Sequence, residues 1–205
     1  MNYLAHLYLS DPDDAHRLGN LAGDWVKGRL QGQPLPPRVI EGVRRHRAVD
    51  SYSDQHPLML EAREKLPAQR RRVAGIILDM LWDHFLVRHW SDYHPRPLRD
   101  FLDDCYAGLD RLQPYWPPGA QRALPRIIEE DWLSAYGDLD AVAFSLDRIA
   151  RRLRRDPGLA GAMQDVLPLY AELEADFLRF DLFRIPHQQL DTHLNQHSTL
   201  RGSGC

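Results

Sequence analysis

The sequence predicts an all-α protein that folds as one compact multi-helix domain. No segment alternates apolar and polar residues as a half-buried strand does, whereas apolar residues recur at helical spacing along most of the chain. Prolines separate the periodic segments, as expected at helix boundaries. The length of 205 residues suits a single domain with a substantial core.

The first helices are separated by residues that favour turns. Residues 3–9 are apolar enough to form a short helix, and Asp11-Pro12-Asp13 ends it and caps the next one, over 14–30. A turn-rich loop follows at 31–37.

Prolines open two of the next three helices. Helices over 37–54 and 57–67 each begin at a proline, whose fixed φ suits the first helical turn. The central helix begins after Gln69 and extends to about residue 93, because apolar residues continue through it almost without interruption.

The carboxyl-terminal half is punctuated in the same way. Pro95 and Pro97 open a helix that extends to residue 112, and residues 114–118 form a rigid proline-rich linker. Helical spacing then predicts three further helices, over 120–136, 139–154 and 159–183, for a total of eight to ten.

Pro186 is expected to end the compact domain, which we assign to residues 1–186. Residues 187–205 form a polar tail, and the sequence of 201–205 is typical of disordered chain.

The segment 73–90, VAGIILDMLWDHFLVRHW, is apolar nearly all round yet carries Asp79 and Asp83. A helix that is hydrophobic on every side belongs in a protein interior, and positions four apart lie on one face. A buried carboxylate must find a cation or take up a proton, because an unpartnered buried charge is costly. One divalent metal ion would serve both carboxylates, so the segment predicts a metal-dependent enzyme.

His46 and Asp50 are candidate co-ligands. They are four residues apart in HRAVDSYSDQHP, so a helix places both on one face, with Asp54 one turn further along. Imidazole and carboxylate together suit Mn, Fe or Zn. The alternative is an exposed His–Asp pair on a surface helix, which would be preferred if the central helix carried no acidic pair.

Asp24 is a further candidate ligand, in GNLAGDWVKG. An interior Gly costs ~1 kcal/mol relative to Ala in an exposed helix, so Gly19 and Gly23 indicate that another backbone approaches closely there. That approach would bring Asp24 into a tight seam. Alternatively, Asp24 caps a helix or pairs with an arginine, and the residues leave both interpretations open.

Two histidines would have other roles. His6 lies in the apolar segment NYLAHLYL, where a histidine is more often a hydrogen-bonded core residue than a ligand. His84 follows Asp83 and lies ~140° round the helix from Asp79, so the two cannot easily share a metal ion. His84 would instead orient a ligand or act as an acid on a neighbouring face.

Arginine outnumbers lysine and is concentrated in three runs, although the net charge is only −3. Each run alone is best interpreted as a solvated helix face, but together they indicate an anionic partner, because arginine suits bidentate contact with phosphate and carboxylate. The runs are Arg44, Arg45 and Arg47; Arg70, Arg71 and Arg72; and Arg151, Arg152, Arg154 and Arg155.

The cellular location expected from the sequence is cytoplasmic. There is no secretory signal and no uninterrupted apolar stretch of the ~18 residues that a spanning helix needs, so no membrane partner is expected. The two cysteines, Cys105 and Cys205, allow no disulfide framework and no CxxC metal motif.

Four motifs occur in order: NYLAHLYLS, GNLAGDWVKG, HRAVDSYSDQHP and AGIILDMLWDHFLVRHW. Together they resemble the acyl carrier protein phosphodiesterase family, an unorthodox branch of the HD phosphohydrolases. The resemblance implies an HD-like helical fold and release of 4′-phosphopantetheine from holo-acyl carrier protein, with Mn²⁺ as the expected cofactor and Fe²⁺, Mg²⁺ or Zn²⁺ as alternatives. The chain lacks the adjacent His-Asp pair of orthodox members, and Asp83-His84 has the reverse order.

We therefore choose site residues from helical geometry and burial. The metal would lower the pKa of a bound water and polarise a phosphoryl oxygen. His6 or His84 would act as the general acid, and Arg47 or Arg72 would neutralise phosphoryl charge. The expected metal ligands are Asp24, His46, Asp50, Asp79 and Asp83.

The expected partner is the acidic acyl carrier protein, held through arginine-rich faces, with no nucleic acid bound. Two alternatives remain: an HD-like phosphohydrolase acting on a nucleotide or another small phosphodiester, and a non-catalytic helical binding protein. The native metal, the number of ions and the oligomeric state are left open by the sequence.

Overall fold

The computed structural model describes residues 1–153 and 158–199, and these form helices joined by loops, with no strand. The predicted all-α class is confirmed. The α-helices of these residues are α1 (Tyr3–Tyr8), α2 (Asp14–Ala22), α3 (Pro37–Gln55), α4 (Pro57–Lys65), α5 (Ala74–Arg88), α6 (Trp90–Tyr93), α7 (Leu98–Arg111), α8 (Ala120–Glu129), α9 (Trp132–Ala135), α10 (Leu139–Arg152), α11 (Met163–Val166), α12 (Tyr170–Arg179) and α13 (His187–Thr199). Short 3₁₀ turns connect several of them: η1 (Gly23–Trp25), η2 (Ala68–Val73), η3 (Gln113–Tyr115), η4 (Leu167–Leu169) and η5 (Asp181–Arg184).

Several predicted helices are interrupted, so the predicted total of eight to ten is too low. The helix expected over 14–30 ends at Ala22, and the loop beyond η1 has glycines with positive φ at Gly28 and Gly32. The helix expected over 120–136 breaks at Asp131, whose φ is 47°. Helical spacing of apolar residues continues across such breaks, because both flanking helices bury a face in the same core.

The long helices expected over 70–93 and 159–183 are interrupted too. The first is divided into η2, α5 and α6, and the second into α11, η4, α12 and η5.

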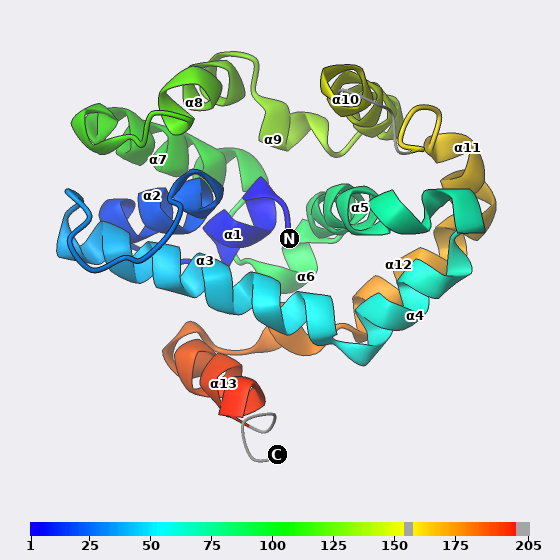
Figure 1. Ribbon diagram of the computed structural model, residues 1–205, viewed down its shortest axis with the longest axis horizontal. Helices are drawn as coiled ribbons and strands as arrows, with labels where there is room; N and C mark the ends of the chain where they lie inside the picture. The colour runs from blue at the N-terminus through cyan, green and yellow to red at the C-terminus, as the bar shows by residue number, and fades with distance from the viewer. Residues whose placement is uncertain (154–157, 200–205) are drawn as a thin grey trace.

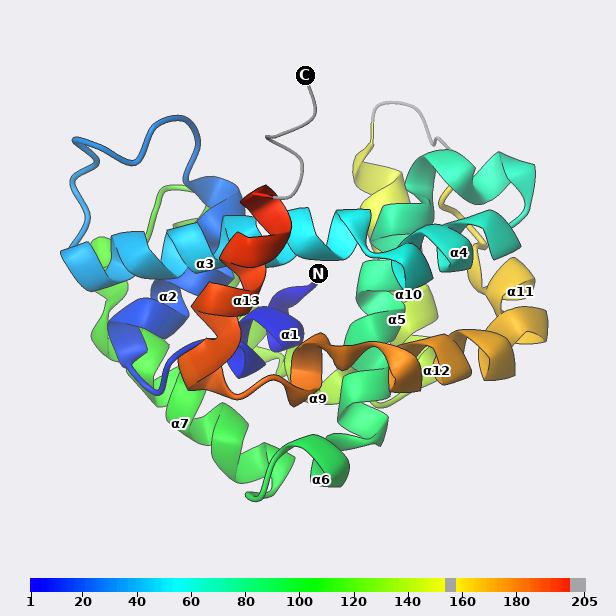
Figure 2. The same ribbon diagram turned by 90° about the horizontal axis from the view of Figure 1, so that it is seen from below.

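Helix α5 lies at the centre of one half of the molecule, as its all-round hydrophobicity predicted. Its residues Ile77, Leu81, Trp82 and Phe85 have no exposed surface, and the helix contacts α1, α4, α10 and α12. Helices α1, α2 and α3 form a second group, in which α2 packs against both α3 and α7, and α3 extends from this group towards α4 (Figures 1 and 2).

Helices α2 and α3 cross at very close range, which positions the site described below. A Cβ added to Gly19 would lie 2.0 Å from the carbonyl oxygen of Val39, and one added to Gly42 would lie 2.2 Å from that of His16. Only glycine permits this approach of the two backbones. The close approach predicted from the small residues of GNLAGDWVKG is therefore confirmed.

The packed structure continues beyond the predicted boundary at residue 186. Helix α13 lies beside α3 and buries Leu190 and Leu194 (Figure 2). The buried guanidinium of Arg45 donates from Nε and Nη2 to the carboxylate of Asp191, at 2.6 and 2.9 Å. Residues 187–199 are thus helical, because two leucines and one acid in a polar sequence were enough to dock them. Residues 201–205 lie outside the described residues.

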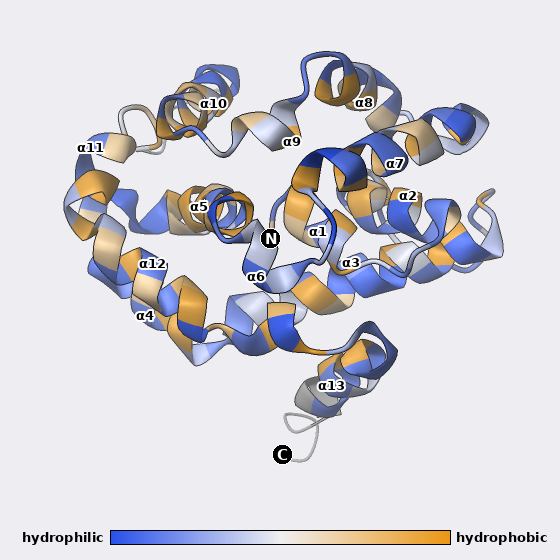
Figure 3. Ribbon diagram, turned by 180° about the vertical axis from the view of Figure 1, so that it is seen from behind, coloured by the Kyte–Doolittle hydropathy of each residue, from blue (hydrophilic) through white to orange (hydrophobic). Residues whose placement is uncertain are grey.

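Most helices carry both hydrophobic and hydrophilic residues (Figure 3), as expected for helices that share a core and also meet solvent. Among the described residues, no helix is both long and apolar enough to cross a membrane.

Candidate metal centre

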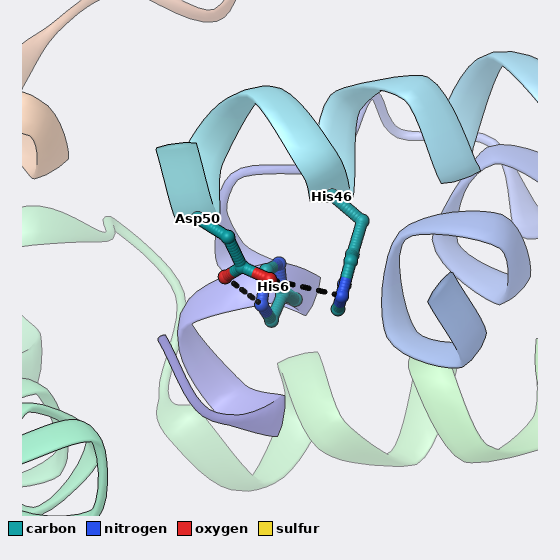
Figure 4. Close-up of side chains that lie close together, drawn as sticks. All are labelled: His6, His46 and Asp50. Atoms are coloured by element: carbon teal, nitrogen blue, oxygen red, sulfur yellow. Dashed lines mark ion pairs between the residues drawn. The ribbon is translucent and has the colours of Figure 1, made fainter. Parts of the chain in front are cut away.

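Three side chains from two helices converge in Figure 4: His6 from α1, and His46 and Asp50 from α3. Their candidate ligand atoms all lie within 4.8 Å of one another. His6 Nε2 lies 3.2 Å from Asp50 Oδ1, and His46 Nε2 lies 3.1 Å from Asp50 Oδ2. Asp50 therefore uses one oxygen towards each imidazole, and we call these three residues the His–His–Asp cluster.

Local structure explains the positions of the histidines. His46 and Asp50 lie one turn apart on one face of α3, as their spacing predicted. The backbone of η1 presses against the His46 ring, since a Cβ added to Gly23 would lie 2.3 Å from its Cγ. The two imidazole rings stack with centroids 4.0 Å apart.

Asn20 orients both histidines, a role that the sequence alone did not indicate. Its side-chain amide donates from Nδ2 to the carbonyl of His6 at 2.7 Å and to Ser10 Oγ at 3.0 Å, so its Oδ1 accepts from His6 Nδ1 at 3.0 Å. Its backbone carbonyl accepts from His46 Nδ1 at 2.7 Å. The available signal in the sequence was a polar asparagine among the small residues of GNLAGDWVKG, four residues before Asp24.

These hydrogen bonds place the Nδ1 proton of each ring away from the cluster. In neutral His6, Nε2 then carries a lone pair, and this buried atom makes no hydrogen bond. The lone pair faces the Asp50 carboxylate at 3.2 Å. Two electron-rich atoms facing each other call for a cation between them, and an imidazole fixed in this way by a carbonyl group is typical of metal-binding histidines.

The electrostatics of the cluster differ between its histidines. Burial lowers the pKa of His6 to about 4, although the protonated ring would donate from Nε2 to Asp50 and be attracted by its charge, so His6 is neutral near pH 7. Burial acts in the same direction on His46, but hydrogen bonds and charges from Asp24 and Asp50 outweigh it and raise its pKa to about 9. Burial would raise the pKa of Asp50, but His46 and His6 hold it far below its usual range.

Asp24 and Asp79 lie at the edge of the cluster. Asp24 Oδ1 is 3.6 Å from His46 Nε2, and the Asp24 side chain is 64% exposed, so it faces solvent rather than the predicted interior seam. The neighbouring His46 imidazole lowers the pKa of the Asp24 carboxyl. The Met1 amino nitrogen lies 3.2 Å from an oxygen of Asp79 and 3.2 Å from one of Asp50, so carboxylates from α3 and α5 face one cation.

Asp83 has a different role from the one predicted. Its oxygens accept the backbone N–H groups of Leu4 at 2.8 Å and Ala5 at 2.9 Å, which caps the first turn of α1. Burial raises its pKa to about 7. The assumption that both acids of the central helix face one metal is therefore corrected: Asp83 positions the helix that carries His6, and only Asp79 faces the cluster side.

The remaining predicted residues are not brought into the cluster. His84 is buried, and its ring nitrogens contact the carbonyl of Tyr136 at 2.7 Å and the hydroxyl of Tyr170 at 2.8 Å. Arg47 donates to the carbonyls of Val26 and Gly28 at 2.8 and 3.0 Å, which holds the loop that follows Asp24. Arg72 is exposed on η2.

Replacing Asn20 with alanine is expected to weaken Mn²⁺ binding by about 10–100-fold, because the two imidazoles lose the group that orients them. Isothermal titration of the metal-free protein with Mn²⁺ measures this effect. Ser10→Ala removes one partner of Asn20 but leaves the contact with His6, so its affinity should stay within about threefold of wild type. Equal affinities of the folded Asn20→Ala protein and the wild type would contradict the assigned role.

Comparison with known proteins gives one consistent family. The sequence model described as acyl carrier protein phosphodiesterase matches residues 1–182. A Yersinia pestis protein of that name is 40% identical over 181 residues, which are 88% of this chain and 93% of that protein. Proteins of the same name from Photorhabdus laumondii and Escherichia coli O157:H7 are each 38% identical over 88% of this chain and over 91% and 93% of their own lengths. No solved structure matches, so the HD-like architecture stays a prediction.

Proposed function

The chain belongs to the acyl carrier protein phosphodiesterase family, and on that premise we propose that it hydrolyses the phosphodiester linking 4′-phosphopantetheine to holo-acyl carrier protein. The products are free phosphopantetheine and the apo carrier. The observation that supports a hydrolytic site in this chain is the His6 Nε2 lone pair, buried without a hydrogen bond and facing Asp50.

A divalent metal, Mn²⁺ by preference and Fe²⁺, Mg²⁺ or Zn²⁺ otherwise, is part of the proposal. The donor set suits such an ion, because it combines two imidazole nitrogens and carboxylate oxygens whose orientation is fixed by Asn20. When bound, the ion would lower the pKa of a water and polarise a phosphoryl oxygen. His6, His46 and Asp50 would hold it, with Asp24 and Asp79 as further oxygen donors at the edge.

The other predicted site residues have separate proposed roles. His6 is neutral near pH 7, so we assign it to metal binding rather than to the general-acid role considered above. His84 is held between Tyr136 and Tyr170, and we propose that it supports the packing of α5. Arg47 fixes the loop next to Asp24, and so it would position that carboxylate instead of contacting phosphate.

Acyl carrier protein is acidic, and we propose that exposed arginines attract it. Two arginines of the predicted runs are not available to a partner. Arg45 is buried against Asp191, and Arg70 is bound to Asp165 and to the carbonyl groups of 158, 160 and 161. The exposed members are Arg44, Arg47, Arg71, Arg72, Arg151 and Arg152, whereas Arg154 and Arg155 lie outside the described residues.

Mass spectrometry of holo-acyl carrier protein, incubated with the enzyme and Mn²⁺, tests the activity. We expect the carrier to lose the phosphopantetheine mass, and no loss when EDTA is added. In the same assay KM should rise with salt, because exposed charges are screened over about 8–10 Å at physiological ionic strength. An unchanged carrier mass would exclude the activity, and a salt-independent KM would exclude the arginine-mediated attraction.

The cytoplasmic location and the absence of nucleic-acid and membrane partners stay predictions. If the carrier is unchanged and the protein holds no metal by elemental analysis, the non-catalytic binding protein becomes the better interpretation. Metal bound together with hydrolysis of a small aryl phosphodiester alone would favour the small-substrate phosphohydrolase.

A further inference from the structure

A groove of about 260 Å³ lies between the loop that follows η1 and the segment from η3 to α8. Its apolar walls include Trp25, Leu35, Tyr115 and Trp116. Lys27 and Gln33 supply its polar side chains.

The walls of the groove are fixed before any ligand binds. Trp25 packs against the backbone of Gly119, where an added Cβ would lie 2.2 Å from Trp25 Cδ1. The indole of Trp116 donates from Nε1 to the carbonyl of Leu109 at 3.0 Å. Prolines at 34, 114, 117 and 118 restrict the backbone on both sides. A preformed groove binds a flexible ligand without losing free energy to the ordering of its own walls.

The chain connects the edge of the cluster directly to the groove. Asp24, whose carboxylate lies 3.6 Å from His46 Nε2, is followed directly by Trp25, which forms the near wall. The Trp25 ring also stacks with the Tyr3 ring from α1, with centroids 5.9 Å apart. Asp24, at the edge of the cluster, and Trp25, in the wall of the groove, are therefore consecutive residues.

We propose that this groove binds the pantetheine arm of the substrate, an inference that rests on the proposed function. The arm is a narrow chain with a geminal dimethyl group and two amides. Its apolar carbons suit the aromatic and proline walls, and its amides suit Gln33 and Lys27 at the polar side. Its reach from phosphorus is about 15 Å, taking 3.3–3.6 Å for every three bonds of an extended chain. The groove therefore sets the specificity for a phosphodiester that carries pantetheine.

We assign the groove to the prosthetic group rather than to the carrier polypeptide, because apolar aromatic and proline walls with few polar side chains suit a narrow chain that carries two amides. The carrier protein would stay outside, with only its prosthetic group inserted.

Two variants test the groove from opposite directions. Leu35→Trp fills it, and Tyr115→Ala removes a wall whose side chain is 44% exposed, so neither change removes a fully buried residue. Leu60→Ala is the matched control, because Leu60 is also 44% exposed but lies on α4, away from the groove. For each protein we would measure kcat and KM with holo-acyl carrier protein, and the inhibition constant of free 4′-phosphopantetheine, with the thermal midpoint as a check on folding.

We expect both groove variants to raise the KM and the inhibition constant about tenfold, with a smaller change in kcat and none in the control. A tenfold change corresponds to about 1.4 kcal/mol of binding free energy. Wild-type inhibition constants in the folded variants would overturn the proposal, whether or not KM rises, because a rise in KM alone would mean that the groove contacts the carrier polypeptide. Failure of the wild type to cleave holo-acyl carrier protein would instead overturn the proposed function, and loss of phosphopantetheine binding in Leu35→Trp would still identify the groove.

Discussion

Replacing Asp50 with alanine is expected to lower kcat/KM for holo-acyl carrier protein by about 10³-fold or more, equivalent to about 4 kcal/mol of transition-state stabilisation. Asp50 contacts both imidazoles of the cluster, and it also contacts the Met1 amino group, which Asp79 faces as well. Without it, His6 and His46 lose the carboxylate that lies between them. The measurements are steady-state kinetics with Mn²⁺ and metal content by elemental analysis.

Asp54→Ala is the control for this substitution. Asp54 lies one turn further along α3, is 61% exposed and pairs with Arg63 rather than with the cluster. Exposed ion pairs of this kind contribute little to stability, so we expect near-wild-type metal content and activity. An Asp50→Ala protein that keeps its metal and its activity would refute the assignment of the cluster as the catalytic centre.

The second large effect concerns stability. Asp83→Ala is expected to lower the free energy of unfolding by about 3 kcal/mol, because it leaves the buried N–H groups of Leu4 and Ala5 without acceptors, at about 1–3 kcal/mol each. Activity should fall as well, since α1 carries His6. Urea denaturation of the metal-free protein measures the change. Asp83→Asn keeps one acceptor and should lose less stability than the alanine variant.

The pH dependence of stability separates this role from that of a metal ligand. Burial raises the folded-state pKa of Asp83 from 3.8 to about 7, so its ionisation opposes folding. The stability that the protonated group contributes is therefore complete below pH 3.8 and is lost as pH rises through about 7. Asp83→Asn cannot ionise and should lack this decline. Full stability of Asp83→Ala with loss of bound metal would instead identify Asp83 as a ligand.

The parts of the site that were predicted correctly depend on local geometry. His46 and Asp50 are four apart on one helix, so their shared face follows from the helical repeat alone. The close crossing near Gly19 and Gly23 follows from small residues placed where larger ones would be preferred in an exposed helix. Both inferences needed only the identity of residues within one segment.

The different contacts of Asp79 and Asp83 could not be predicted in this way. Four residues advance an α-helix by one full turn plus ~40°, and this small offset is enough to send the two carboxylates to different neighbours. Asp83 accepts hydrogen bonds from the first turn of α1, whereas Asp79 pairs with the Met1 amino group, which lies beside Asp50. Which neighbour lies at each position depends on how α1 packs on α5.

By itself, the sequence determined the helical class, the buried central helix and the His46–Asp50 pair, because helical periodicity and residue size act over a few residues. Only the tertiary structure decided that His6 completes the cluster and that Asn20 fixes both imidazoles, since these contacts join α1, α2 and α3. It also decided that Asp83 caps a helix. The physical reason is that a hydrogen-bond partner for a buried polar group is chosen by which helix packs against it, and no local pattern records that choice.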